Sequence, residues 1–234
     1  MKLHTKLIGA LLAFASPFAS AAIIDFEGFS AGTIIDNEYS STLGVTIEGY
    51  NLDRSAGNLG VVFDTNNFTG EDSDLASPFS SNNGLGPLNP GNVLIIHETP
   101  SECNSVACTD PDDEGSRPSG YFNISFSELV TLNSVDFFDV ENPEAQAPAN
   151  RIELFGANNT QVFPNTFFSP NTGGDNKWDR LDFGVAGISR VKIHLGGSGA
   201  IDNINFTAVS EPGMWLFLVF GLAMLRCLRA RQSA

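Results

Sequence analysis

Short runs of alternating apolar and polar residues, separated by stretches rich in turn-forming residues, make up the middle of the chain. In residues 121–126 the apolar side chains Phe122, Ile124 and Phe126 alternate with less apolar ones, and residues 190–195 alternate in the same way. A period of two is typical of a strand with one buried face. The pattern predicts about ten strands, at residues 22–27, 44–50, 59–63, 92–97, 121–126, 132–140, 151–155, 180–183, 190–195 and 200–206.

The region between the two ends has no internal repeat and no helical period long enough to predict a helix. Strands without intervening helices favour an all-β fold, and we predict a β-sandwich of the jelly-roll type. The chain has 234 residues, 42% of them hydrophobic, which is enough for one main core. We therefore expect one sandwich domain at residues 23–208, flanked by a signal peptide and a short transmembrane sorting helix.

Residues 1–22 differ from this pattern. Lys2 and Lys6 precede a mainly apolar run at residues 7–18, and the small residues 19–22 follow it. Positive charge, a short apolar segment and small residues predict a secretory signal peptide that is cleaved near residue 22. The alternative is an uncleaved membrane anchor, but a span needs about 20 apolar residues, more than this run supplies. We expect the protein to be secreted across the inner membrane.

Residues 209–234 form a second distinct segment. It contains the motif Ser210-Glu211-Pro212, an apolar run around Gly221, and a basic cluster of Arg226, Arg229 and Arg231. An apolar run followed by arginines is a stop-transfer pattern, in which the arginines stay on the cytoplasmic side. The run is short for a permanent span, which favours a transient anchor.

This order of elements resembles the PEP-CTERM sorting signal of Gram-negative bacteria. The resemblance implies a protein that is held briefly in the inner membrane, cut near the motif by an exosortase, and delivered to the cell surface or to extracellular polymer. The family motif usually begins with Pro where this chain has Ser210. Exosortase and the secretion machinery are therefore the expected partners, and a simple C-terminal anchor is the alternative.

The negative charge of the chain is concentrated between the two terminal segments. Of the 12 basic residues, five lie in the two terminal segments, whereas only one of the 27 acidic residues does, so the body has 7 basic and 26 acidic residues and a charge of −19. Such a surface repels phosphate backbones, and we expect no nucleic-acid partner. It suits a domain that stays soluble among polymers and divalent cations outside the cell.

Two cysteines lie in the body, because Cys227 belongs to the C-terminal segment. An isolated pair in an exported chain predicts a disulfide between Cys103 and Cys108. The alternative is a metal pair, but no His or further Cys stands nearby at ligand spacing. The pair lies in a long loop at residues 99–118, and a second long loop covers residues 64–91. Loops of this length are usually functional or disordered, and the sequence leaves open whether both lie at one edge of the sandwich.

No recognisable catalytic pattern is present. His97 and His194 lie outside any nucleophile-elbow or paired-histidine metal motif. His194 alternates with apolar neighbours, so we interpret it as an exposed strand residue. We therefore expect a protein without enzymatic activity. A carboxylate pair for glycoside hydrolysis has no fixed sequence spacing, which keeps a secreted carbohydrate-active enzyme of jelly-roll fold as the alternative.

Three carboxylates of the terminal strands are candidate calcium ligands. Asp202 shares the parity of Ile204 and Phe206, and a carboxylate on an apolar face is costly unless it is paired or bound to a metal. Asp25 and Glu27 share one face of the first predicted strand. First and last strands often lie side by side in jelly rolls, so we predict that Glu27 and Asp202 meet around one calcium ion, with Asp25 beside them.

A second resemblance supports the same ligands. Residues 24–28 and 199–206 resemble the ends of galactose-binding-like and carbohydrate-binding jelly-roll modules. In those modules a Glu of the first strand and an Asp of the last hold a structural calcium, which implies this role for Glu27 and Asp202. The alternative is that Asp202 caps a turn and accepts hydrogen bonds from backbone amides.

Sugar binding requires exposed aromatic rings beside polar groups. Trp178 is the one Trp of the body and lies between Asp175 and Asp179 in a polar loop, so these three residues form the predicted ligand site. Tyr39, Tyr50 and Tyr121 are further candidates, and the alternative for Trp178 is inward packing. The predicted function is a non-catalytic module that binds polysaccharide at the cell surface or in the extracellular matrix. A structural matrix protein without a ligand is the second alternative.

Overall fold

A computed structural model describes residues 20–54, 57–68, 72–113, 117–142 and 148–208 of the chain. The predicted sorting segment at residues 209–234 and nearly all of the predicted signal peptide fall outside these ranges. In the described ranges, no helix is long and apolar enough to cross a membrane.

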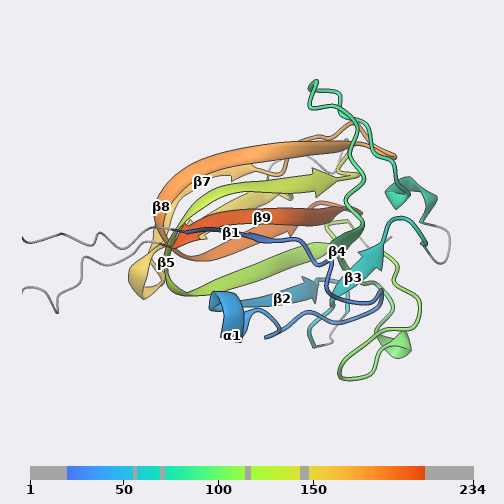
Figure 1. Ribbon diagram of the computed structural model, residues 1–234, viewed down its shortest axis with the longest axis horizontal. Coiled ribbons are helices and arrows are strands. Elements are labelled where there is room, and N and C mark those ends of the chain that lie inside the picture. Colours follow the sequence, from blue (N-terminus) through green and yellow to red (C-terminus); the bar gives the residue numbers. More distant parts are fainter. Residues whose placement is uncertain (1–19, 55–56, 69–71, 114–116, 143–147, 209–234) are drawn as a thin grey trace, which may run out of the picture. The chain divides into compact units, whose positions relative to one another are not determined.

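The described chain is mostly β, which confirms the predicted class (Figure 1). Its nine strands are β1 (Ala21–Ile24), β2 (Val45–Asn51), β3 (Gly60–Asp64), β4 (Asn92–Ile96), β5 (Gly120–Phe138), β6 (Arg151–Phe155), β7 (Gln161–Phe168), β8 (Trp178–Leu195) and β9 (Ala200–Ala208). Its helices are short: α1 (Ser40–Leu43) and the 3-10 turns η1 (Ser73–Leu75), η2 (Pro100–Glu102) and η3 (Ala157–Asn159).

Each of the predicted strands corresponds to an observed one, but two pairs are continuous. β5 joins the runs predicted at residues 121–126 and 132–140, and β8 joins those at 180–183 and 190–195. β7 is the strand that the pattern missed, because its sequence contains Pro164 and does not alternate. Proline is tolerated in a strand at the edge of a sheet, and β7 lies at such an edge.

The strands form one open antiparallel sheet in the order β3-β4-β9-β5-β8-β6-β7, with β1 beside β9 and β2 beside β5. β5 pairs with β8 along most of its length. Its other edge pairs with β2 over residues 120–126 and with β9 over residues 130–138. The register of β5 against β8 shifts between Ser125 and Val130, and both long strands curve at one end of the sheet (Figure 1).

The main core is shared by the two halves of the bent sheet. Phe122 and Ile193 belong to the first half, Phe137 and Ile201 to the second, and all four are fully buried in one cluster. The two halves therefore bury one apolar face between them, which is the dominant favourable contribution to folding. The alternation predicted for residues 121–126 is confirmed, since the side chains at 122, 124 and 126 all lie in this core.

A smaller apolar cluster connects the strands with the loops. Phe79 of the first long loop packs edge-on against Phe138 at the end of β5, with ring centroids 4.8 Å apart. Cys108 of the second long loop belongs to the same cluster. The loops gather at the end of the sheet opposite the curves of β5 and β8 (Figure 1). The described parts of the loops at residues 64–91 and 99–118 therefore lie at one end of the fold, a point that the sequence left open.

The two ends of the described body lie side by side. Ala21 of β1 pairs with Thr207 of β9, so the first and last strands are neighbours, as predicted. This pairing lies at the curved end of the sheet, away from the loops (Figure 1).

Candidate functional site

The predicted metal ligand Asp202 lies where β9 changes its partner. β4 pairs with β9 at Ile201, and β1 pairs with it from Ile204 onward. Asn203, between these positions, has a left-handed backbone with φ of 48° and adds one residue to β9 relative to β5. This β-bulge breaks the strand alternation, and Ile201 and Ile204 both enter the main core. The parity argument for Asp202 is therefore wrong, because it assumed a regular strand.

The conclusion that Asp202 is shielded from water nevertheless agrees with the structure. Its side chain is 1% exposed; Oδ2 accepts a hydrogen bond from Asn203 Nδ2 at 2.9 Å, whereas Oδ1 has no hydrogen-bond partner. Burial raises the pKa of Asp202 to about 9; a hydrogen bond from the backbone of Asn203 opposes this, and the charges of Asp136, Asp25 and Glu27 add to it. Asp202 has the backbone contact of a turn-capping residue, but one carboxylate oxygen stays unpaired.

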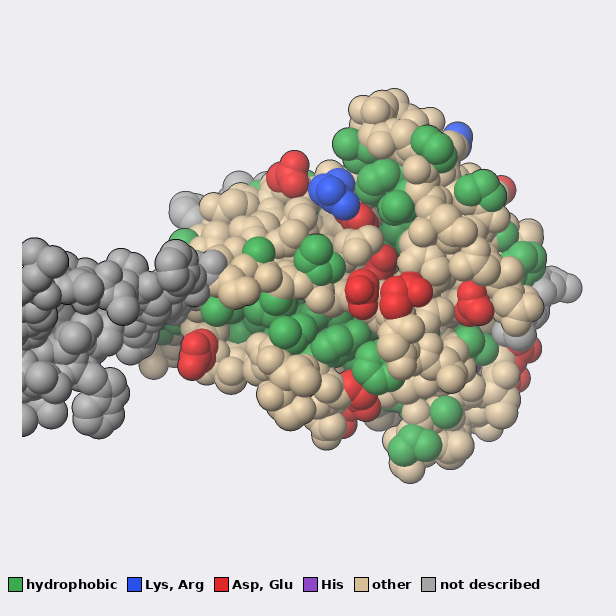
Figure 2. Space-filling model, in the orientation of Figure 1, with side chains coloured by type: hydrophobic (Ala, Val, Ile, Leu, Met, Phe, Trp, Pro, Cys, Tyr) green, Lys and Arg blue, Asp and Glu red, His purple; other side chains and the backbone are tan. Residues whose placement is uncertain are grey.

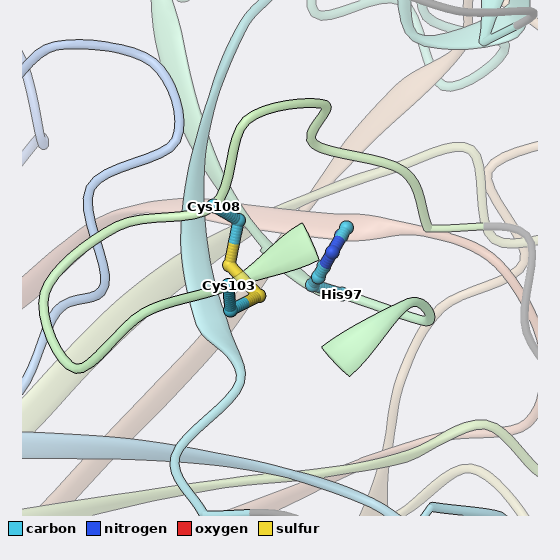
Figure 3. Close-up of side chains that lie close together, drawn as sticks. All are labelled: His97, Cys103 and Cys108. Carbon is cyan, nitrogen blue, oxygen red and sulfur yellow. A yellow bond between two sulfur atoms is a disulfide. The ribbon is translucent and has the colours of Figure 1, made fainter. Parts of the chain in front are cut away.

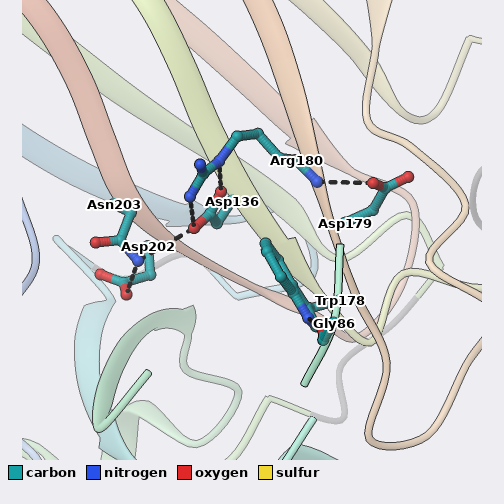
Figure 4. A network of polar contacts seen from close by, with 7 residues as sticks. All are labelled: Gly86, Asp136, Trp178, Asp179, Arg180, Asp202 and Asn203. Atoms are coloured by element: carbon teal, nitrogen blue, oxygen red, sulfur yellow. Dashed lines mark hydrogen bonds and ion pairs between the residues drawn. The ribbon is translucent and has the colours of Figure 1, made fainter. Parts of the chain in front are cut away.

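Asp136 is a member of this site that the sequence did not reveal. It pairs with Asp202 across β5 and β9, and its carboxylate accepts two hydrogen bonds from Arg180, from Nε at 2.6 Å and from Nη2 at 2.8 Å. Asn203 Nδ2 also donates to Asp136 at 3.1 Å, so one amide bridges two buried carboxylates (Figure 4). The available signal was a charged residue within the apolar run 135–138, because a buried charge needs a partner.

β1 ends at Ile24, so the prediction that Asp25 and Glu27 share one face of the first strand is wrong. Both residues lie in the segment after β1, where Phe26 has a left-handed backbone with φ of 56°. Glu27 Oε1 accepts a hydrogen bond from the backbone N–H of Asn92 at 2.6 Å, and a Cβ at Gly91 would lie 2.4 Å from that oxygen. Asn92 Nδ2 in turn donates to the carbonyl of Phe26 at 3.1 Å. Acidic side chains gather near the ends of β1 and β4 in the face shown in Figure 2. Gly91 also has φ of 73°, a left-handed conformation that favours glycine at this position.

These groups form a set of oxygen donors with excess negative charge. Asp136 is neutralised by Arg180, whereas the charges of Asp25 and Glu27 act unfavourably on Asp202. Carboxylate and amide oxygens suit Ca²⁺, so the residues present fit this ion. In the described part of the chain, however, no three carboxylates place ligand atoms within 4.8 Å of one another. An ion at this junction would therefore complete its coordination with backbone carbonyls or water.

A different group of potential ligands is compact but unavailable for metal. His97 lies beside Cys103 and Cys108, with the ligand atoms of all three residues within 4.8 Å of one another (Figure 3). The two sulfurs form a disulfide, as the sequence predicted. Nδ1 of the buried His97 ring accepts from the Asp112 backbone N–H at 3.1 Å, and Nε2 lies 3.0 Å from the carbonyl of Thr99. These contacts occupy both ring nitrogens of His97, and the disulfide occupies both sulfurs. The three residues therefore stabilise the loop and offer no free ligand atom for a metal.

Trp178 does not form the exposed platform that was predicted for sugar binding. Its side chain is 5% exposed, and its indole N–H donates to the carbonyl of Gly86 at 2.9 Å (Figure 4). Its ring stacks on Phe138. Asp179 is also buried and accepts a hydrogen bond from Asn83. The inward packing of Trp178 arises because the loop at residues 79–88 folds over the start of β8. Asp175 is exposed.

An aromatic and polar patch lies instead on the outer face of the sheet. Tyr50, Tyr121 and His194 align in register across β2, β5 and β8. The two tyrosine rings are partly exposed, with centroids 5.0 Å apart, and Lys192 Nζ lies 3.7 Å from the centre of the Tyr121 ring. Alternate residues of these strands fill the core, so the polar side chains between them point to solvent on this face.

The expectation that His194 is exposed is wrong, although it does lie in a strand, β8, as predicted. The side chain is only 5% exposed, because Tyr121 packs against it with ring centroids 5.4 Å apart. Its Nε2 lies 2.9 Å from Glu153 Oε2. Burial lowers the pKa of His194, which outweighs the opposite effect of Glu153. The ring is therefore neutral near pH 7 and donates its N–H to the Glu153 carboxylate.

No protein-family model matches the chain, and no curated protein matches its sequence.

Replacing Arg180, the positively charged partner of Asp136, tests the electrostatics of the junction. Arg180→Met leaves a fully buried carboxylate without its charge partner, and we expect a loss of about 2–3 kcal/mol in the free energy of unfolding. The value lies below that for a fully buried pair because the Arg180 side chain is 42% exposed. Denaturation with urea measures this difference.

Arg54→Met is the matched control for this substitution. The Arg54–Asp53 pair is about half exposed on both sides, so its loss should cost less than about 1 kcal/mol. Equal losses for the two variants would contradict a special role of the Asp136–Arg180 pair.

Proposed function

We propose that the protein is an exported, non-catalytic β module that binds polysaccharide at the cell surface or in the extracellular matrix and contains a structural calcium ion. The observation that carries the proposal is the buried, unpaired Oδ1 of Asp202 at the junction of the first and last strands. An ionised carboxylate without a partner is strongly unfavourable in that position, whereas a bound cation makes it favourable.

The calcium ion would be held by Asp202, Glu27 and Asp25, and it would supply positive charge without any redox or acid–base chemistry. Glu27 already contacts the start of β4 through Asn92, and Asp202 lies between the parts of β9 that pair with β4 and β1. An ion shared by these residues would join the N-terminal segment to two strands. The proposed ion therefore contributes to the stability of the fold, and the proposed polysaccharide-binding surface lies elsewhere.

The bent sheet supports a β-sandwich of the jelly-roll type. Its two halves place residues such as Phe122 and Phe137 in one core, as two packed sheets would. The continuous strands β5 and β8 connect these halves.

The outer face of the sheet is the surface that supports polysaccharide binding. Tyr50 and Tyr121 offer partly exposed rings, and their neighbours in the next row are Glu48, Asn123 and Lys192. Aromatic rings contact the apolar faces of sugars, and the surrounding polar groups can hydrogen-bond to hydroxyls. This patch takes the place of the predicted site around Trp178.

The alternative of a carbohydrate-active enzyme has less support. Two carboxylates have strongly raised pKa values, Asp202 at about 9 and Asp139 at about 8. Both are buried, and neither lines the surface hollows of about 590 and 240 Å³. A general acid has to reach its substrate, so these two groups do not favour catalysis. A matrix protein without a ligand is the second alternative, and the glycan experiment below distinguishes it.

Export by a PEP-CTERM-like route rests on the sequence of the two terminal segments. The described body adds one compatible feature, because its first and last strands pair at the end opposite the loops.

Calcium should raise the thermal midpoint of the purified protein, and EDTA should reverse the increase. At a calcium concentration about 100 times the dissociation constant, one site contributes about 2.7 kcal/mol. We expect Asp202→Asn to remove the part of the calcium-dependent increase in the thermal midpoint that this site provides. In EDTA the same variant should be at least as stable as the wild type, since it removes a buried unpaired carboxylate. Differential scanning calorimetry measures all four states.

Asp53→Asn controls for the loss of one negative charge, because Asp53 lies on the surface beside Arg54. An unchanged midpoint with EDTA, or a full calcium response in Asp202→Asn, would rule out this calcium site.

Polysaccharide binding should depend on the tyrosine pair. Affinity electrophoresis in gels containing xylan, galactan or soluble β-glucan should retard the wild-type protein in at least one polymer. We expect Tyr50→Ala and Tyr121→Ala each to weaken that binding by about tenfold, the loss typical of a buried aromatic contact.

Phe68→Ala, which removes a 40% exposed aromatic ring from a loop, is the control and should bind like the wild type. Absence of retardation in every polymer would favour the matrix protein without a ligand. If both tyrosine variants are still retarded like the wild type, the polysaccharide binds at a different surface.

The sorting model predicts the mass of the exported protein. Intact-mass spectrometry of material recovered outside the inner membrane should find both terminal segments removed, with cleavage near residue 22 and near the Ser210-Glu211-Pro212 motif. Deleting residues 226–234 should cause accumulation of the uncut form, because the arginines hold the segment in the membrane. An exported protein that retains its arginine cluster would refute exosortase processing.

A further inference from the structure

The outer face of the first half of the sheet carries a large share of the positive charge of the body. Of the seven basic residues of the body, three lie on β6 and β8 in this face: Arg151, Arg190 and Lys192. Their side chains are partly exposed, and the residues between them, Ile152 and Val191, are buried in the main core. A strongly acidic body therefore gathers cations on one of its surfaces.

Strand register places these cations beside the tyrosine pair. Lys192 of β8 lies opposite Asn123 of β5. Two residues further along, His194 lies opposite Tyr121, which lies opposite Tyr50 of β2. Lys192 Nζ lies 3.7 Å from the centre of the Tyr121 ring, a cation–π contact. A sugar on the tyrosine rings would therefore meet an ammonium group beside them.

The charge of Lys192 is not neutralised by an ion pair. Glu153 is its partner across the ladder, but the Glu153 carboxylate lies 2.9 Å from His194 Nε2 and 3.5 Å from Arg151 Nε. Among the described residues, no carboxylate oxygen lies within 4.0 Å of Lys192 Nζ. The ammonium group is thus available to an anion from outside.

Arg190 presents a guanidinium group of fixed orientation two residues before Lys192. Its Cζ lies 3.7 Å from the centre of the Phe155 ring. Nη1 donates to Asn123 Oδ1 at 3.0 Å, and Nε and Nη2 both donate to Asn159 Oδ1. These bonds use three of the five N–H groups of a guanidinium, so two remain. A planar group that is already held in place loses little freedom when it binds an anion.

The local balance of charge on this face is positive. Its acidic residues in the paired segments 46–50, 121–125, 151–155 and 190–194 are Glu48 and Glu153, against three cations. Glu48 accepts a hydrogen bond from Asn123 Nδ2 at 3.4 Å, so it is engaged within the face. Exposed charges further away than about 8–10 Å are largely screened at physiological ionic strength. A ligand on this face would therefore interact mainly with the nearby cations and not with the net charge of the body.

We propose that the polysaccharide bound at this face is acidic, with carboxylate or sulfate groups on its sugars, and that Lys192 and Arg190 bind these groups. The inference rests on the proposed polysaccharide binding at Tyr50 and Tyr121. The tyrosine rings contact the apolar face of a sugar, while the ammonium and guanidinium groups bind its anionic substituents. Hydrogen bonds between charged partners are about twice as strong as neutral ones, so the site favours acidic polymers over neutral ones.

Fluorescence anisotropy with end-labelled oligosaccharides of matched backbone tests the proposal. Oligogalacturonate is titrated beside its carboxyl-reduced form, and an oligosaccharide of a sulfated galactan beside its desulfated form, all at one calcium concentration. We expect at least one acidic oligosaccharide to bind at least about tenfold more tightly than its neutral form. Raising the salt concentration from about 50 to about 200 mM should weaken the binding of the acidic form only, because salt screens exposed charges. The two pairs distinguish carboxylate from sulfate.

Lys192→Gln should weaken binding of the acidic oligosaccharide by about tenfold and leave that of the neutral form within about twofold, because the tyrosine rings remain. Arg190→Gln should act in the same direction. Lys177→Gln is the matched control, since Lys177 Nζ donates to Ser80 Oγ at the loop end, and it should change neither affinity. Circular dichroism checks that each variant is folded.

Two results would overturn the acidic ligand: neutral forms that bind as tightly as the acidic ones, or acidic binding that Lys192→Gln leaves unchanged. The proposed function survives either result as long as binding still depends on Tyr50 and Tyr121. Binding of neither the acidic nor the neutral forms would overturn both.

Discussion

The pairing of β5 with β8 is the interaction on which the rest of the structure depends. Both strands continue through a bend, so one ladder of hydrogen bonds runs through both halves of the sheet. Phe122 precedes the bend and Phe137 follows it, and both are buried in the same hydrophobic core. The same ladder fixes Asp136 beside Arg180 in the second half and Tyr121 beside His194 in the first half. The core, the charged junction and the outer aromatic patch are therefore consequences of one pairing.

Negative charge is the second constraint, and it is placed in two buried positions. Asp202 and Asp139 are each almost completely buried, and each has an oxygen without a hydrogen-bond partner. At the junction, Arg180 neutralises Asp136, and this ion pair uses one of the few basic residues of the body. A body of −19 charge that shields carboxylates in this manner is best balanced by cations from its surroundings. Calcium, the ion proposed above, suits such carboxylates because its ligands are oxygens.

The proposed roles divide the molecule into separate regions. The buried carboxylate of Asp202 lies at the junction of β1, β4 and β9, where the proposed ion would act on stability. The tyrosine pair lies on the outer face of β2 and β5, where a polymer could contact it without disturbing the core. Trp178, the most prominent aromatic residue of the sequence, serves packing and joins the loop at Gly86 to β8. The proposed polysaccharide binding and the proposed cation stabilisation thus involve different residues.

The sequence by itself determined the all-β class, the positions of nearly all strands and the Cys103–Cys108 disulfide, because each depends on local alternation or on a short spacing. It missed β7, whose Pro164 interrupts the pattern, and it could not show that two pairs of runs are continuous strands. Only the tertiary structure decided that Trp178 and His194 are buried, since loops and neighbouring rings from distant segments cover them. Only it placed Asp136 beside Asp202. Their proximity arises from strand register, which no local spacing encodes.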